Sequence, residues 1–177
     1  RCLSRGLGDV YKRQHILSQM IVFSVGLLNC KTNKSLGVEK RKSLIMNPDL
    51  QKLNNYVLLV KDKPFTWFSH DCLTFTNDAF KAMYGKGWAD DWIGKYHEGN
   101  KTFKRDQLRQ IFQAKTIEDA ISQKLTRIDG IPPKGALVLT DRCRKWVIGK
   151  AMGIAYGRYG LFLSNQGLET IPIEDVH

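Results

Sequence analysis

The sequence predicts an α+β fold, with helices in the first half of the domain and an antiparallel sheet in the second. Residues 49–125 repeat apolar side chains at helical spacing, whereas residues 136–173 form short β-like runs separated by glycine-containing turns. A break at 131–135, which holds two prolines and a glycine, separates the two patterns. Helices followed by an antiparallel meander are typical of an α+β domain.

The helical half begins with a helix over residues 49–61, for which Asn47 or Asp49 is the N-cap. The second helix starts at Cys72, and Gly85 stops it. A short helical turn and two amphipathic helices follow, at 89–96, 104–114 and 117–125.

The second half is expected to form five short strands, at 136–140, 145–149, 152–156, 159–163 and 167–173. Gly157 and residues 165–167 supply the hairpin connections between the last three of them.

The first 45 residues are left out of this fold prediction. Residues 4–14 match the in-frame translation of a transposase-type sequencing adapter, so residues 1–14 are interpreted as a library artefact. Residues 39–42 can be encoded by a purine-rich run, as a ribosome-binding site is, shortly before Met46. We therefore expect translation to start at Met46 and residues 15–45 to be read-through of upstream DNA.

A rival interpretation starts translation at Met20 and takes residues 21–28 as the apolar core of a signal peptide. This core is about half as long as usual, lacks a basic residue before it, and is too short to span a bilayer. Residues 27–30 resemble a lipoprotein cleavage site only faintly, because Asn29 stands where a small residue is needed. Secretion is therefore not expected, and the domain is assigned to residues 46–177.

Most of the net charge lies outside the assigned domain. The chain carries +11, but residues 1–45 hold nine basic and two acidic side chains, so residues 46–177 carry only +4. A nucleic-acid-binding module is therefore kept only as a second alternative. The domain retains Cys72 and Cys143, which have neither metal-ligand spacing nor a disulfide framework, so no metal, no cofactor and a reducing cytosolic site of synthesis are expected.

Cys72 is the most informative residue, because it lies in the first turn of a predicted helix. Free backbone N–H groups and the helix dipole favour a thiolate there, and cysteine hydrolases activate their nucleophile in this way. Asp71 is expected to cap the helix and orient the thiol. The alternative is that Cys72 is a small apolar core residue, since free cysteine is among the most buried residue types.

Several segments resemble papain-like cell-wall peptidases of the NlpC type, namely Phe65-Thr66-Trp67 followed by Asp71-Cys72, the strand that starts at Gly135, and Ala151-Met152-Gly153-Ile154 with Gly157. A closer resemblance, over nearly all of residues 46–177, is to a phage and prophage family described only as a domain of unknown function (family 6950) and distantly related to those peptidases. The matching elements are Pro64-Phe65 with Trp67, Asp71-Cys72, Tyr96, the Gly135 strand, Gly153-Ile154 with Gly157, and Gly167-Leu168 with Pro172.

The resemblance implies a single papain-like domain in which N-terminal helices, one of them bearing Cys72, pack on a small antiparallel sheet. It also implies a phage-tail setting, because members of the family often lie near tail genes. We therefore expect synthesis in the host cytoplasm, association with the virion, phage tail proteins or peptidoglycan peptides as partners, and no membrane partner. The family's C-terminal tails usually run a few residues further, which predicts that this domain is truncated after His177.

The catalytic base of the peptidases has no counterpart in this sequence. Their histidine on the second strand takes the thiol proton, and here Ala151 occupies that position. Ala136 likewise replaces the usual aspartate of the first strand. His70, just before the Asp-Cys pair, is the candidate base that remains, and His97 and His177 are further imidazoles in a loop and at the terminus.

Three functions are therefore considered, and whether the protein is an enzyme is left open. The favoured hypothesis is a phage- or prophage-encoded, tail-associated papain-like domain that is catalytically impaired relative to the peptidases. The alternative is an active cysteine hydrolase or amidase that cleaves peptidoglycan peptides with a non-standard base, since a thiolate needs less help from a base than a serine hydroxyl does. The second alternative is the nucleic-acid-binding module.

Overall fold

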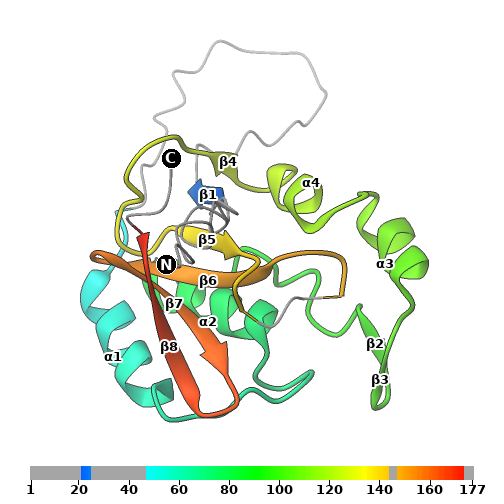
Figure 1. The fold of residues 1–177 in the computed structure, drawn as a ribbon, viewed down its shortest axis with the longest axis horizontal. Coiled ribbons are helices and arrows are strands. Elements are labelled where there is room, and N and C mark those ends of the chain that lie inside the picture. The colour runs from blue at the N-terminus through cyan, green and yellow to red at the C-terminus, as the bar shows by residue number, and fades with distance from the viewer. Residues whose placement is uncertain (1–20, 25–46, 144–146, 174–177) are drawn as a thin grey trace, which may run out of the picture.

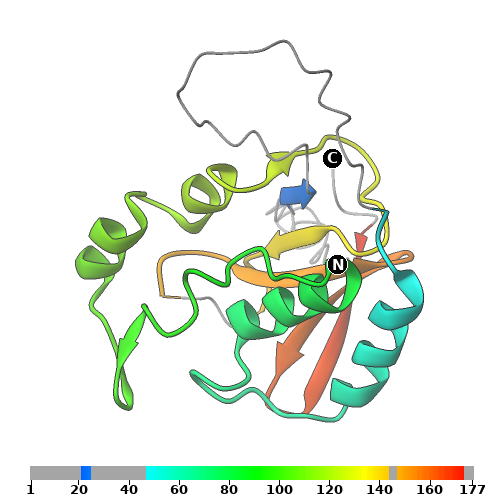
Figure 2. The same cartoon turned by 180° about the vertical axis from the view of Figure 1, so that it is seen from behind.

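The computed structural model describes residues 21–24, 47–143 and 147–173, and these residues form an α+β fold (Figures 1 and 2). The elements within them are, in chain order, β1 (Ile21–Ser24), α1 (Leu50–Val60), α2 (Cys72–Tyr84), β2 (His97–Glu98), β3 (Lys101–Thr102), α3 (Arg105–Phe112), α4 (Ile117–Ser122), β4 (Thr126–Arg127), β5 (Leu137–Thr140), β6 (Ala151–Tyr156), β7 (Tyr159–Ser164) and β8 (Gly167–Pro172).

The larger sheet holds six antiparallel strands in the order β4-β1-β5-β6-β7-β8, while β2 and β3 form a separate hairpin. The strands β5 to β8 are neighbours in sequence as well as in the sheet, so they form a meander. The exception is β1, which precedes every other element in the chain and yet lies between β4 and β5 (Figure 1).

Helices α1 and α2 pack against each other on one face of the sheet, and α2 crosses β6 and β7 (Figures 1 and 2). The main hydrophobic core fills this layer, with fully buried side chains that include Leu53, Leu73, Phe75, Leu137 and Ile154. Because strand residues alternate between faces, a second, smaller cluster forms on the other side of β5, β6 and β7. Its buried members are Ala136, Val138, Ala151, Ala155, Phe162 and Ile173.

Helix α2 begins and ends at residues that satisfy its free backbone groups. Asp71 accepts hydrogen bonds from the first turn, and Thr74 completes a capping box with the Asp71 backbone. Gly85 ends the helix at φ +77°, and its N–H donates to the Lys81 carbonyl. These two signals fix the position of Cys72 in the first turn of a helix whose inner face is buried.

The predicted α+β class is confirmed, and the four predicted helices are present. Helix α2 has the predicted bounds, whereas α1, α3 and α4 are shorter than predicted. Residues 89–96 form turns. The strand predicted at 145–149 is wrong where the chain is described, because residues 147–149 form a turn. The Ile148 carbonyl there accepts a hydrogen bond from the Ile117 N–H (3.3 Å), so this backbone holds α4 and does not join the sheet.

The predictions for residues 1–45 and for the chain after His177 stay predictions. Residues 1–14 and His177 lie outside the described residues. Residues 15–45, which are predicted to be read-through, include β1, and their origin stays a prediction.

The outer edge of β8 is covered where it meets α1. The N–H of Leu168 points away from β7 and donates to the carbonyl of Lys61 at the end of α1 (2.8 Å). Gly167 permits this approach, because a Cβ at that position would lie 2.3 Å from the Lys61 carbonyl oxygen. At the other end of the strand Pro172 has no N–H to offer, so little of this edge can pair with another chain.

We predict that Gly167→Ala lowers the free energy of unfolding by about 2–4 kcal/mol, because it adds a clash with the end of α1 to the strain of a positive φ. Gly157→Ala is the matched control: Gly157 also has a positive φ, but no heavy atom lies within 4 Å of its Cβ position. We expect the control to lose about 1 kcal/mol in urea unfolding. Equal losses in the two variants would contradict the close approach.

Candidate functional site

The carboxylate of Asp71 is fully buried and holds together the loop before α2 and the start of the helix. Its Oδ1 accepts hydrogen bonds from the N–H groups of Leu73 (3.1 Å) and Thr74 (3.0 Å). Its Oδ2 accepts from the Phe68 N–H (3.1 Å) and from the Tyr96 hydroxyl (2.5 Å). Both oxygens are therefore used in binding the surrounding chain, and Asp71 acts as a structural cap rather than as a proton carrier.

The loop that approaches α2 is tightly closed. The backbones of Thr66 and His70 exchange two hydrogen bonds (2.9 and 2.8 Å), and between them Phe68 adopts φ +71°. That backbone conformation is unfavourable for a bulky side chain. It is stabilised by the Phe68 N–H bond to Asp71 and by packing of the Phe68 ring on His97, with centroids 4.2 Å apart.

Cys72 is buried in the main hydrophobic core. The residue is only 4 % exposed, and burial raises the pKa of the thiol to about 12, with the charge of Asp71 acting in the same direction. Backbone N–H groups of Met152, Cys72 and Leu73 lower the pKa of the thiol, but by less. At neutral pH the side chain is therefore a protonated thiol, which is a poor nucleophile.

On the sheet side, the backbone N–H of Met152 approaches the Cys72 thiol. Met152 and Ile154 belong to the core beneath α2, whereas Ala151 and Ala155 belong to the cluster on the other face of β6. Ala151 and Cys72 therefore belong to different hydrophobic clusters. In this arrangement a side chain at position 151 points away from the thiol.

The two histidines of the described residues, His70 and His97, lie in different surroundings. His70 is 3 % exposed, its ring lies edge-on to Phe75, and its Nε2 has no hydrogen-bond partner among the described residues. Burial, followed by the charge of Lys63, lowers the pKa of His70. The Nδ1 of His97 lies 3.0 Å from the carbonyl oxygen of Gly99, within its own hairpin.

A pocket of about 500 Å³ opens along α2 but not over Cys72. Thr74, Asn77, Asp78 and Lys81 line its helical wall, and the remaining lining residues are Phe68, Ser69, Asp90 and Ile93. The pocket carries two carboxylates and one ammonium group. Burial raises the pKa of Asp78, and Asp90 acts in the same direction.

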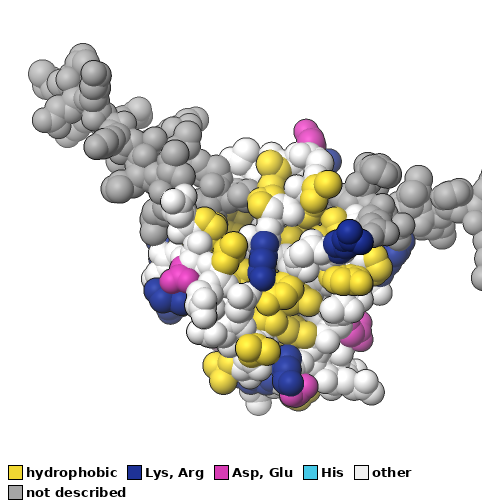
Figure 3. Space-filling model, turned by 90° about the vertical axis from the view of Figure 1, so that its left-hand side faces the viewer, with side chains coloured by type: hydrophobic (Ala, Val, Ile, Leu, Met, Phe, Trp, Pro, Cys, Tyr) yellow, Lys and Arg dark blue, Asp and Glu magenta, His cyan; other side chains and the backbone are white. Residues whose placement is uncertain are grey.

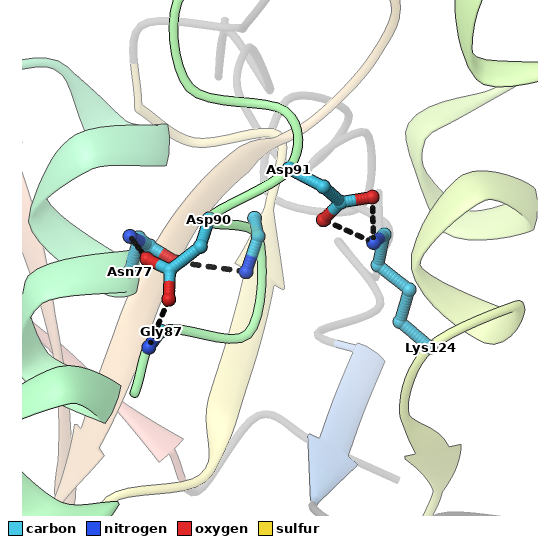
Figure 4. A network of polar contacts seen from close by, with 6 residues as sticks. Asn77, Gly87, Asp90, Asp91 and Lys124 are labelled. Atoms are coloured by element: carbon cyan, nitrogen blue, oxygen red, sulfur yellow. Dashed lines mark hydrogen bonds and ion pairs between the residues drawn. The ribbon is translucent and has the colours of Figure 1, made fainter. Parts of the chain in front are cut away.

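A polar network at this wall joins α2 to the segment that follows it (Figure 4). The Asn77 amide donates to Asp90 (2.8 Å) and accepts from the Ala89 N–H (2.7 Å), while the Gly87 N–H donates to the other oxygen of Asp90 (2.8 Å). Sequence reasoning missed Asn77 and Asp90, which are separated by 13 positions and lie outside any recognised motif.

The same segment also reaches α4. Lys124 donates to both carboxylate oxygens of Asp91 (2.5 and 2.7 Å; Figure 4). Its ammonium group also lies over the ring of Trp92, 4.8 Å from the ring centroid. Trp92 packs on Phe112 of α3. These contacts therefore connect the α3–α4 region to the segment that follows α2.

The described residues hold no group of three or more His, Cys, Asp or Glu side chains that could bind a metal ion. No helix within them is long and apolar enough to cross a membrane.

A family model described as a domain of unknown function (DUF6950) matches residues 47–177. This match takes in every described element from α1 to β8 and begins after β1. Neither the curated proteins nor the solved structures include a match to the chain.

We predict that Tyr96→Phe lowers the free energy of unfolding by about 1.5–3 kcal/mol, because it leaves the buried Asp71 carboxylate without one donor. Tyr56→Phe is the matched control, since it removes a hydroxyl bonded to a neutral acceptor, the Phe75 carbonyl (3.2 Å). We expect about 0.5–1.5 kcal/mol for the control in the same urea titration. A Tyr96→Phe variant as stable as the unchanged chain would show that the bond does not stabilise the loop.

We predict that Cys72 is alkylated by iodoacetamide at pH 8 about a thousandfold more slowly in the folded chain than in guanidinium, because its thiolate is scarce and covered. Peptide mass spectrometry follows each cysteine separately. The half-buried Cys143, whose pKa burial raises to about 11, is the internal comparison and should react faster than Cys72. Equal rates for Cys72 in the two states would mean that its thiol is accessible.

Proposed function

The chain belongs to the DUF6950 family of domains of unknown function, and from that premise we propose that it is a non-hydrolytic, papain-like structural module of a phage or prophage tail. One observation carries the non-hydrolytic part: the Cys72 thiol is buried and protonated, and the described group that approaches it from the sheet is the backbone N–H of Met152.

The papain-like part of the proposal is supported by the order of the elements. The cysteine starts a helix that packs on an antiparallel meander, and the meander follows the helix in sequence. The phage-tail setting, the virion location after synthesis in the host cytoplasm, and tail proteins as partners rest on the family resemblance of the sequence.

A role in protein contact is further supported by the surface over α1. Leu58 is 65 % and Leu59 81 % exposed on this helix, and Leu50 is also exposed. Figure 3 shows the side of the molecule on which α1 lies, and apolar side chains gather there with Lys or Arg side chains among them. Such gatherings are typical of protein-contact surfaces rather than of surfaces that face only water.

The proposal predicts no cleavage of peptidoglycan. Purified sacculi are incubated with the chain and with a Cys72→Ala variant, and released muropeptides are measured by liquid chromatography. We expect neither protein to release more than buffer does. Release by the chain that Cys72→Ala abolishes would establish the hydrolase alternative.

The structural role is tested in a phage that encodes the domain. We expect Cys72→Ala to leave the yield of infective particles unchanged, and deletion of the gene to reduce that yield by at least tenfold. A loss of particles on Cys72→Ala, with the variant as stable as the unchanged chain, would mean that the thiol has a chemical role.

A further inference from the structure

We propose that the gap between β4 and β5 is an acceptor site for an extended apolar strand, and that Ile21–Ser24 fills it here as an exchangeable insert. In the sheet β4 and β5 are not neighbours: both pair with β1. Val22 lies opposite Val138 of β5, and Ser24 lies opposite Thr126 of β4. The backbone of this short strand therefore completes the ladders on both sides of the gap, as in β-strand addition.

The β5 wall of the acceptor site is held without help from β1. On its other side β5 pairs with β6 over its whole length, from Leu137 opposite Ile154 to Thr140 opposite Ala151. Its side chains anchor both faces of the sheet, since Leu137 and Leu139 lie in the main core and Val138 lies in the smaller cluster.

The β4 wall is also anchored elsewhere. The Ile117 N–H at the start of α4 donates to the Ile148 carbonyl (3.3 Å), and Glu118 pairs with Lys150 (3.7 Å), so α4 is tied to the connection before β6. Lys124, which lies two residues before β4, is bound to Asp91 (Figure 4). Removal of β1 therefore leaves two fixed walls with unpaired backbone groups between them.

The family match gives the reason to regard β1 as an insert. The match covers residues 47–177 and so includes both walls, but it does not include Ile21–Ser24. Between Ser24 and Asn47 lie 22 residues, enough chain to span roughly 70 Å when extended. The connection is therefore long enough for β1 to leave the gap while residues 47–177 stay folded.

The chemistry of the gap defines its occupant. Leu137, Val138 and Leu139 are all fully buried, so both faces of the neighbouring strand are apolar. A strand that is buried on both faces usually consists of consecutive apolar residues, as residues 21–23 (Ile-Val-Phe) do here. We assign the site to an extended, β-branched apolar segment of an assembly partner, antiparallel to β5. This inference goes beyond the proposed function and does not depend on whether Cys72 is inert.

The test uses the full chain and a Val22→Pro variant, in which proline disrupts the ladders of a central strand. The probe is a fluorescein-labelled peptide of residues 18–27, and binding is followed by fluorescence anisotropy. We expect the variant to bind the peptide at 1:1 stoichiometry and the unchanged chain to bind at least tenfold more weakly, because its site is already filled. A peptide that itself carries Val22→Pro is the control and should not bind.

Two results would overturn the proposal: a folded Val22→Pro variant that fails to bind the peptide, and equal binding by the variant and the unchanged chain. A second protein covers the case in which the variant does not fold. A specific protease site is placed within residues 25–46 of the full chain, and the cleaved protein is separated from its N-terminal fragment by gel filtration. We expect a folded remainder that binds the labelled peptide. Unfolding of the remainder, or a folded remainder that does not bind, would contradict an acceptor site with fixed walls.

Discussion

The buried carboxylate of Asp71 is the interaction on which the site depends. It caps α2, holds Phe68 in an unfavourable backbone conformation, and binds the Tyr96 hydroxyl from a segment 25 positions away. A buried charge is tolerated only when its hydrogen bonds are complete, and here four donors meet its two oxygens. The entry loop, the helix start and the segment before β2 therefore share one anchor, and the buried Cys72 is the next residue in the chain.

The protonation of the Cys72 thiol is decided by two opposing effects of different size. A helix N-terminus stabilises an anion by about 0.3–1 kcal/mol at the surface and by about 2 kcal/mol in favourable buried sites. Burial, with the Asp71 charge, raises the pKa of the thiol from 9.0 to about 12, which corresponds to roughly 4 kcal/mol against the thiolate. Burial prevails, so a position that would activate an exposed cysteine keeps this one protonated. The same geometry under a neutral, open loop would favour the opposite outcome.

The sequence predicted those features that local chemistry specifies. The Asp71 and Gly85 signals define α2, and the glycine and asparagine turns define the β6–β7–β8 meander. It did not predict features that depend on distant partners. Alternation along β6 separates Ala151 from Met152, but only the packing of α2 shows which of the two faces the thiol. Likewise, β4 is too short to show a period, and the apolar run 147–149 joins α4 instead of the sheet because its carbonyl has a partner there.

Where the segment that contains β1 is translated, the place of β1 in the sheet also sets an order of events during synthesis. Val22 pairs with Val138, so more than a hundred residues must be added before this strand meets β5. At about 5–20 residues per second the ribosome takes on the order of ten seconds to make that stretch. For that interval Ile-Val-Phe lies outside the tunnel without a sheet to join, while each later strand of the meander finds its neighbour almost as soon as it emerges. Among the described strands, β1 therefore waits longest for a neighbour.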